Sequence, residues 1–134
     1  MRNIIFRGRS IAHHGKKEEW VYGFYSNYKG VNGRTHYISD DNGRSVAVQP
    51  ETVGQYTGLT DKNGKRIYEG DILKVYYYGK SKIFGVVKFG ETRFFIDDNF
   101  MGGDIKAKAP MSDMFSKYDF EVVGNIHDNP ELLN

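Results

Sequence analysis

The sequence contains one pair of carboxylates at a spacing that could support general acid–base chemistry. Glu69 and Asp71 stand two residues apart, so on a strand their side chains would share one face. Gly70 lies between them, just before an apolar run, and is typical of a bulge or turn that leads into a strand. In that setting Asp71 would accept hydrogen bonds from turn amides. We therefore predict a structural role for this pair and keep a small enzyme with a Glu69/Asp71 site as the third interpretation.

Other catalytic and metal-binding signatures are missing from the sequence. Cysteine is absent, which excludes thiol nucleophiles, thiolate metal sites and disulfides. The four histidines do not have the spacing of a zinc protease: His13, His14, His36 and His127. Two Asp-containing turns, at residues 40–43 and 61–64, fail the register of a calcium loop, and no nucleophile-elbow, Walker or dinucleotide motif occurs. We predict no catalytic residue, no metal and no cofactor.

Basic and aromatic residues alternate across residues 74–95, in a mixture that single-stranded nucleic acid binders use to stack bases and follow phosphates. Leu73, Val75 and Tyr77 share an apolar face, and the opposite face is unusually aromatic for contact with solvent alone. We define that opposite set as the candidate interaction face: Lys74, Tyr76, Tyr78, Phe84, Lys88 and Arg93. An exposed aromatic face usually contacts a partner. That partner could be nucleic acid, another subunit, or the N-terminal half of the same chain.

The elements that must position these residues are short strands. Many β-branched and aromatic residues, with 16 glycines and three prolines, favour strands joined by tight turns. Asn-Gly pairs at 32–33, 42–43 and 63–64 predict type I′ hairpin turns. Strands at 72–78, 83–89 and 93–96 form a predicted antiparallel meander with a turn at 79–81, and residues 120–126 form a closing strand. Helix is limited to a segment opened by Pro110 and a final turn with Asn129 as its cap.

Length and charge narrow the class of protein. The 134 residues suffice for one ordinary domain, in which residues 1–57 form a hairpin region and residues 58–134 a small barrel. The net charge is only +2, but residues 1–95 carry +7 and residues 96–134 carry −5. This asymmetry is typical of a polyanion-binding face, or of two surfaces that meet in an oligomer. No apolar run approaches the ~18 residues of a membrane span, so we expect a cytoplasmic protein.

Three segments together resemble the YopX family, whose members are small proteins of bacteriophages and prophages, mostly of Gram-positive bacteria. They are residues 5–8, 52–72 and 121–133; residues 6–10 depart from the Arg-Ala-Trp-like run that is more usual in the family, and residues 100–110 do not align. The resemblance implies a mostly β protein with an SH3-like barrel and an oligomeric state. It carries over no activity. The motif positions, to which we assign turn and strand-entry roles, are Gly58, Asp61, Asn63, Gly64, Tyr68, Glu69, Gly70, Asp71, Gly124 and Asn125.

The sequence thus predicts a phage- or prophage-encoded, non-enzymatic binding or assembly module that self-associates in the cytoplasm of its bacterial host. A single-stranded nucleic-acid-binding protein that uses the basic and aromatic face is the alternative. A host or phage protein is a further possible partner. Self-association would bury surplus aromatic rings and could bring the basic N-terminal region against the acidic C-terminal one.

Overall fold

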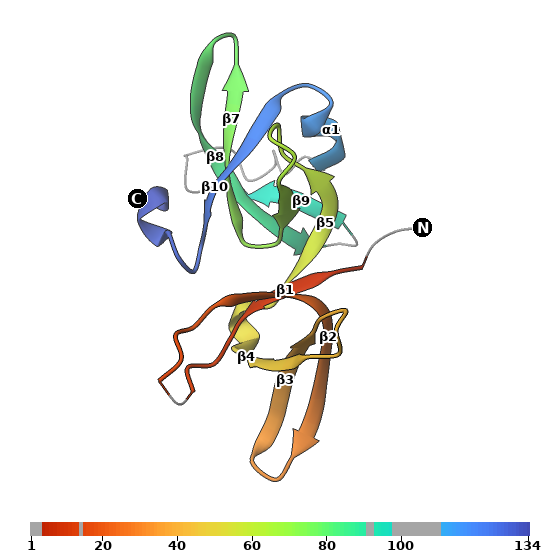
Figure 1. Ribbon diagram of the computed structural model, residues 1–134. Coiled ribbons are helices and arrows are strands. Elements are labelled where there is room, and N and C mark those ends of the chain that lie inside the picture. Colours follow the sequence, from red (N-terminus) through yellow and green to blue (C-terminus); the bar gives the residue numbers. More distant parts are fainter. Residues whose placement is uncertain (1–3, 14, 91–92, 98–110) are drawn as a thin grey trace. The chain divides into compact units, whose positions relative to one another are not determined.

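The structure, a computed structural model, describes residues 4–13, 15–90, 93–97 and 111–134, and it confirms the mainly β, antiparallel fold (Figure 1). The chain divides into two compact units, residues 1–56 and 57–134. The first contains β1 (Phe6–Arg9), β2 (Trp20–Gly30), β3 (Gly33–Ser39), β4 (Ser45–Val48), the 3₁₀ turn η1 (Pro50–Thr52) and the start of β5 (Gly54–Thr60). The second contains the rest of β5, β6 (Arg66–Tyr68), β7 (Asp71–Tyr77), β8 (Lys80–Gly90), β9 (Arg93–Asp97), α1 (Met111–Phe115), β10 (Asp119–Asn125) and the 3₁₀ turn η4 (Pro130–Leu133).

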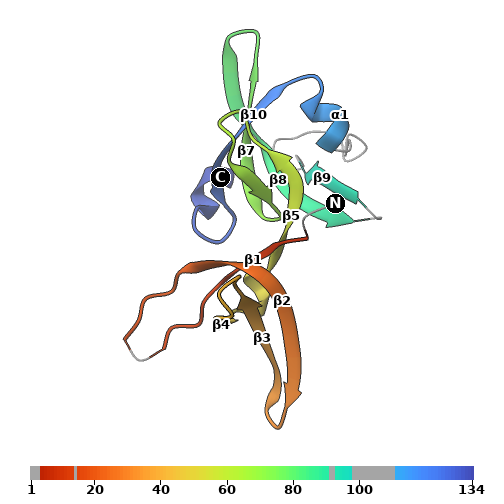
Figure 2. The ribbon, with the colours of Figure 1, turned by 45° about the vertical axis from the view of Figure 1, so that its right-hand side comes forward.

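In the N-terminal unit the strands are ordered β4-β3-β2-β1-β5, and this sheet curls back on itself. The end of β1 meets β4 through a bridge between Ser10 and Val48 and a hydrogen bond from the Gln49 N–H to the Arg9 carbonyl, 2.8 Å long. Ile38 and Val48, each 1% exposed, fill the enclosed space. The hairpin of β2 and β3 extends beyond the rest of this unit (Figure 2). The sequence predicted a hairpin region here, and the pairing of β1 with both β2 and β5 extends it into a curved sheet.

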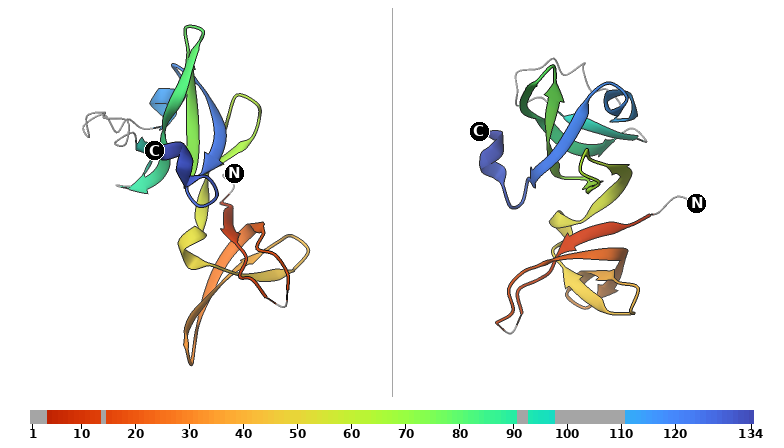
Figure 3. Two further views of the ribbon diagram at one scale, coloured as in Figure 1. Left: turned by 90° about the vertical axis from the view of Figure 1, so that its left-hand side faces the viewer. Right: turned by 45° about the horizontal axis from the view of Figure 1, so that its top comes forward.

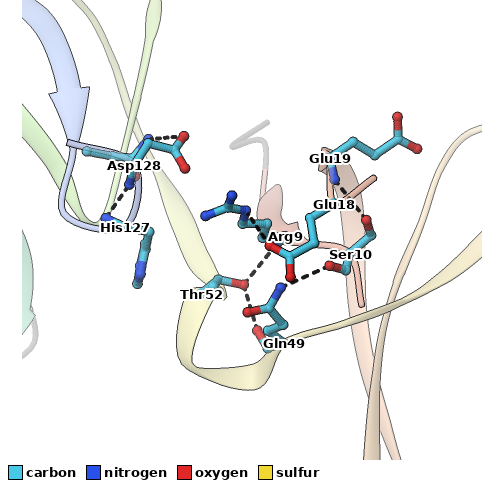
Figure 4. A network of polar contacts seen from close by, with 9 residues as sticks. Arg9, Ser10, Glu18, Glu19, Gln49, Thr52, His127 and Asp128 are labelled. Atoms are coloured by element: carbon cyan, nitrogen blue, oxygen red, sulfur yellow. Dashed lines mark hydrogen bonds and ion pairs between the residues drawn. The ribbon is translucent and has the colours of Figure 1, made fainter. Parts of the chain in front are cut away.

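A polar network fixes the junction of β1, β4 and η1 (Figure 4). The Arg9 N–H donates to Thr52 Oγ1 at 2.8 Å, and that hydroxyl donates to the Gln49 carbonyl at 2.6 Å. Gln49 Nε2 donates to the Ser10 carbonyl at 3.0 Å, and Ser10 Oγ accepts from the Glu19 N–H at 2.9 Å. Thr52 and Ser10 are buried, so these bonds replace the water that their polar groups give up.

The C-terminal unit confirms the predicted meander. β7 pairs with β8, β8 pairs with β9, and β10 closes against the other edge of β7, which gives the order β10-β7-β8-β9. The loop between β5 and β6 contacts β10, because the Lys62 N–H donates to the Phe120 carbonyl at 2.9 Å. One core lies between these elements: Ile67, Leu73, Val75, Val87, Ile96, Met111, Phe120 and Val122. The description of this unit as an SH3-like barrel stays a prediction.

The type I′ prediction for the Asn-Gly pairs is wrong. Positive φ angles occur at Gly33 (106°), Gly43 (80°) and Gly64 (82°), but at none of the preceding asparagines. In the last two turns an aspartate sets the conformation: one oxygen of Asp40, or of Asp61, accepts the backbone N–H groups two and four residues later. Each is therefore a type I turn followed by a left-handed glycine.

The helical segments are short, as the sequence predicts. α1 begins at Met111, while Pro110 lies outside the described residues. η4 begins at Pro130 and Asn129 occupies its N-cap position, as predicted, but the Asn129 side chain makes no capping hydrogen bond; its Oδ1 instead accepts the Asn125 N–H at 3.3 Å. No helix in the described part of the chain is long and apolar enough to cross a membrane.

Candidate interaction site on the β7–β8 hairpin

The hairpin of β7 and β8 ends in a two-residue turn, Tyr78-Gly79, between the paired residues Tyr77 and Lys80. Both turn residues have positive φ, 46° for Tyr78 and 75° for Gly79, so this is a type I′ turn. The sequence placed the turn at residues 79–81, whereas β8 already begins at Lys80. The tip extends beyond the other strands of this unit (Figures 1 and 3).

Tyr78 is held at this tip in a strained and exposed position. A left-handed backbone costs an ordinary L-residue roughly 1–2 kcal/mol, and Tyr78 is the one non-glycine residue with positive φ among those that the structure describes. Its side chain is 96% exposed, so burial of the ring within the chain does not offset this cost. Strain of this kind clusters at ligand-binding and active sites, which makes the tip the first candidate for a contact surface.

Tyr76 lies one pleat below the tip and is fixed by two charged neighbours. Its hydroxyl donates to Glu121 Oε2 at 3.1 Å, and this hydrogen bond raises the pKa of Tyr76 above its ordinary value. Lys62 Nζ lies 3.8 Å from the centre of the Tyr76 ring, and Lys74 Nζ lies 5.8 Å from it. Both ammonium groups are within the range of a cation–π contact. Lys74 and Tyr76 are thus neighbours, as the alternation predicted.

A cavity of about 350 Å³ lies beside the hairpin tip. Its lining residues come from β7, its turn, and the segment that joins α1 to β10: Tyr76, Tyr77, Tyr78, Phe115, Ser116, Lys117, Tyr118 and Asp119. The volume is at the low end of the range for small-ligand sites, about 300–1,000 Å³. Five of the eight lining residues are aromatic, and a lysine and an aspartate stand beside them, a composition that suits a flat aromatic group with polar edges. Phe115, Lys117 and Tyr118 were not among the predicted site residues.

Phe84 does not belong to this face. The strict alternation placed its ring beside Tyr76, but a β-bulge between the Leu73–Gly85 and Lys74–Ile83 pairs shifts the parity of β8. The Phe84 ring therefore packs against the core and meets the ring of Phe120 edge-on, with 5.7 Å between centroids. Its role is in the packing of the C-terminal unit.

Lys88 and Arg93 lie far from the tip. Eight residues of extended strand separate Lys88 from Lys80, a length of about 26 Å. Lys88 Nζ forms an ion pair with Asp97 Oδ2 at 2.6 Å, while Arg93 is exposed at the start of β9. The candidate interaction face therefore divides: Lys74, Tyr76 and Tyr78 surround the tip, and Lys88 and Arg93 lie near the β8–β9 turn.

The motif residues of the β5–β6 turn have a structural role. Asp61 Oδ1 accepts the N–H groups of Asn63 and Lys65, and its Oδ2 accepts the N–H of Val122 on β10 at 3.0 Å. Burial disfavours the charged carboxylate, but these three N–H groups and the Lys65 ammonium outweigh it and hold the pKa of Asp61 below its ordinary value. Gly64, with φ of 82°, completes the turn.

The Glu69–Asp71 pair lies where β6 turns into β7. Asp71 is 1% exposed, and its Oδ2 accepts the N–H of Tyr68 at 2.8 Å, while Tyr68 itself is buried. Gly70 connects this corner to two strands, because its N–H donates to the Val87 carbonyl and its carbonyl accepts the Ile126 N–H. Neither carboxylate lines the cavity described above. Asp71 and Gly70 thus hold the corner at which the chain enters β7, through these hydrogen bonds.

The last motif positions, Gly124 and Asn125, organise the end of β10. Asn125 Oδ1 accepts the N–H groups of His127 and Asp128, and the Asn125 carbonyl accepts the Asn129 N–H. A Cβ at Gly124 would lie 2.5 Å from Asn129 Oδ1 and 2.9 Å from Asn129 Cβ, so only glycine leaves room for this turn. Gly58, with φ of 86°, is a further left-handed position, within β5.

Histidines and acids do not gather into a metal site in the described ranges, where no cluster of three such side chains could hold an ion. His36 contacts a ring instead: its Nδ1 lies 2.6 Å from the Tyr25 hydroxyl, and the two rings stack. His14 lies outside the described residues.

A second aromatic surface, on β2, was not singled out from the sequence. Tyr22, Phe24 and Tyr28 are 49%, 58% and 65% exposed and project from the same side of the strand, because even-numbered residues alternate with odd ones. Tyr28 also contacts the ring of Tyr37, with 5.9 Å between centroids. We call Tyr22, Phe24 and Tyr28 the β2 aromatic row. The alternation of rings from Trp20 to Phe24 was the signal that could have identified it.

Comparison with known proteins identifies the family. A family model described as "YopX protein" matches residues 6–134. A solved structure described as "Crystal structure of protein EF1440 from Enterococcus faecalis" is 26% identical over 83% of this chain and 76% of that one, with a TM-score of 0.44. No curated protein matches the chain. Because the family model covers nearly the whole sequence, this chain belongs to the YopX family.

Proposed function

We propose that this chain is a non-enzymatic binding module, encoded by a phage or prophage, that assembles with copies of itself in the cytoplasm of a bacterial host. The observation that carries the proposal is the β2 aromatic row. Tyr22, Phe24 and Tyr28 stand on one side of a single strand, and each exposes about half or more of its surface. Exposed rings that gather on one side of a strand mark a contact site.

Self-contact is favoured over other partners by the charge of the chain. A net charge of +2 is small for 134 residues, so long-range repulsion between copies is weak. Residues 1–95 and 96–134 carry opposite net charges, +7 and −5, which favours attraction between copies. The origin from a phage or prophage is supported by membership of the YopX family, and so is the oligomeric state that the resemblance implies.

The non-enzymatic part of the proposal is supported by the role of Asp71, one of the two carboxylates, Glu69 and Asp71, that best suited acid–base chemistry. Asp71 accepts a backbone hydrogen bond in a buried corner, and another motif acid, Asp61, holds a turn against β10. Both side chains thus have a structural function that explains why an acid stands there.

Light scattering at micromolar concentration tests self-association. We expect a discrete multiple of 15.4 kDa for the unaltered chain and a mass near 15.4 kDa for Phe24→Lys, which places a charge in the aromatic row. Val31→Lys is the matched control, because it adds the same charge to the same hairpin at a fully exposed loop position. A mass near 15.4 kDa for the unaltered chain, or equal effects of the two substitutions, would contradict the proposal.

A further inference from the structure

We propose that the tip of the β7–β8 hairpin binds single-stranded nucleic acid, with a base in the tyrosine-lined cavity and the phosphates along the lysines of the hairpin. This site is separate from the β2 aromatic row and does not depend on self-association. We call it the tip site, defined by Tyr76, Tyr77, Tyr78, Tyr118 and the surrounding lysines Lys74, Lys80, Lys82 and Lys117.

The rings supply stacking surfaces. Tyr78 is 96% exposed and Tyr118 is 39% exposed, and both line the same cavity. A base stacked on an aromatic side chain gains about 1–3 kcal/mol whatever its identity, since every base has a π-face. The strained backbone of Tyr78 places this ring at the outermost point of the hairpin, where an unpaired strand has access to it.

The charges favour a polyanion. Residues 72–83, which form the part of the hairpin near its tip, contain three lysines and no acid. Lys82 Nζ lies 5.9 Å from the centre of the Tyr77 ring, and Lys62 and Lys74 contact Tyr76, so ammonium groups stand beside the rings. Rings interleaved with cations are the pattern by which single strands are held without sequence readout.

The acids of the site decide which part of the nucleotide enters the cavity. Asp119 lines the cavity and Glu121 accepts the Tyr76 hydroxyl, so a phosphate placed there would be repelled. A base carries no net charge, and its amino groups can donate to a carboxylate. The base therefore belongs in the cavity and the phosphates on the lysines outside it. A duplex keeps its bases within the stack, so it offers phosphates to the lysines but no base to the cavity.

Tyr78→Asn separates binding from folding. Asn-Gly is the preferred pair for a type I′ turn, so this substitution removes the ring and suits the backbone of the hairpin. Fluorescence anisotropy with a labelled mixed-sequence single strand of about 16 nucleotides, at about 50 mM salt, measures the affinity. We expect Tyr78→Asn to raise Kd about tenfold or more. Val31→Asn, which removes a fully exposed apolar side chain from the turn of the other hairpin, should leave Kd unchanged.

Salt dependence tests the lysines. Replacing Lys80 and Lys82 by Gln should reduce the slope of log Kd against log salt by about 1.4, the value for two phosphate contacts on a single strand. Lys16→Gln with Lys17→Gln, an exposed pair in the N-terminal unit, is the control and should leave the slope unchanged.

Three results would overturn the proposal. The first is no binding to the single strand at about 50 mM salt, where electrostatic contacts are strong. The second is equal binding of the single strand and of a duplex of the same sequence, with no effect of Tyr78→Asn. The third is unchanged affinity in Tyr78→Asn together with a changed mass in light scattering, which would assign the ring to contact between copies.

Discussion

Replacement of Asp61 by Ala offers a direct test of how the β5–β6 turn is joined to β10. The substitution removes three hydrogen bonds, from Asn63, Lys65 and Val122. Val122 is 9% exposed, so its N–H loses an acceptor that water cannot easily replace, at a cost of roughly 2 kcal/mol. Asn63 and Lys65 are exposed, and water can restore their bonds, at about 0.5 kcal/mol each. We expect a total loss of roughly 3 kcal/mol in the free energy of unfolding.

The N-terminal unit provides a matched control. Asp40 makes the same pair of bonds, to the N–H groups of Asn42 and Arg44, in a turn of the same type. Both of those residues are exposed, so Asp40→Ala should cost only about 1 kcal/mol. Urea unfolding measures both variants: circular dichroism follows both units, and fluorescence of Trp20, the single tryptophan, follows the N-terminal one. Equal losses for the two variants would refute the role of the Val122 bond.

The same pair of proteins gives a pH dependence with a definite sign. The folded-state pKa of Asp61 is lowered, because burial, which raises it, is outweighed by the three backbone N–H groups. A carboxyl with a lowered folded pKa contributes stability that is fully present above its unfolded pKa of about 3.9 and is lost as pH falls through the folded value. The stability difference between the unaltered chain and Asp61→Ala should therefore shrink below about pH 3.9. A difference that stayed constant down to the folded-state pKa would contradict this assignment.

Three further outcomes follow from the packing and the turns. Tyr78→Asn should raise the free energy of unfolding by about 1 kcal/mol, because it removes the strain of a left-handed Tyr; a lower urea midpoint would contradict that strain. Gly124→Ala should lower that free energy by about 1–3 kcal/mol through its contact with Asn129, a loss that Asn129→Ala in the same chain should partly reverse. Phe84→Ala should lower the free energy of unfolding by about 2 kcal/mol and Lys88→Ala by less than about 1 kcal/mol. A larger loss for Lys88→Ala in thermal unfolding would contradict the packing of Phe84 against the core.

Much of the C-terminal sheet could be predicted from local pattern alone. The apolar alternation at Leu73, Val75 and Tyr77 fixed the inner face of β7, and glycine-containing turns marked where the strands end. The prediction failed at Phe84, because a β-bulge depends on how two strands pair rather than on the residues of one. A one-residue change of register moves every later side chain to the other face.

The cavity at the hairpin tip was beyond sequence reasoning for a different reason. Tyr77 and Tyr118 are 41 positions apart in the chain, and only the pairing of β10 with β7 brings their segments together.

The type I′ prediction for the Asn-Gly turns failed for a local reason that the sequence itself contains. An aspartate two residues before each of the last two asparagines, Asp40 and Asp61, favours an Asx turn, and its side-chain bonds select type I geometry.

The placement of asparagine in this chain bears on the role of Tyr78. Three Asn-Gly pairs occur, and in each the asparagine has an ordinary negative φ that many residues adopt. The type I′ turn of β7 and β8, where asparagine would fit best, has Tyr-Gly instead. The fold alone does not explain this choice, because the ring is almost wholly exposed and the backbone would be less strained without it. A residue that opposes the local preference without stabilising the fold is best explained by contact with a ligand, and the lysines and the cavity beside it indicate which kind.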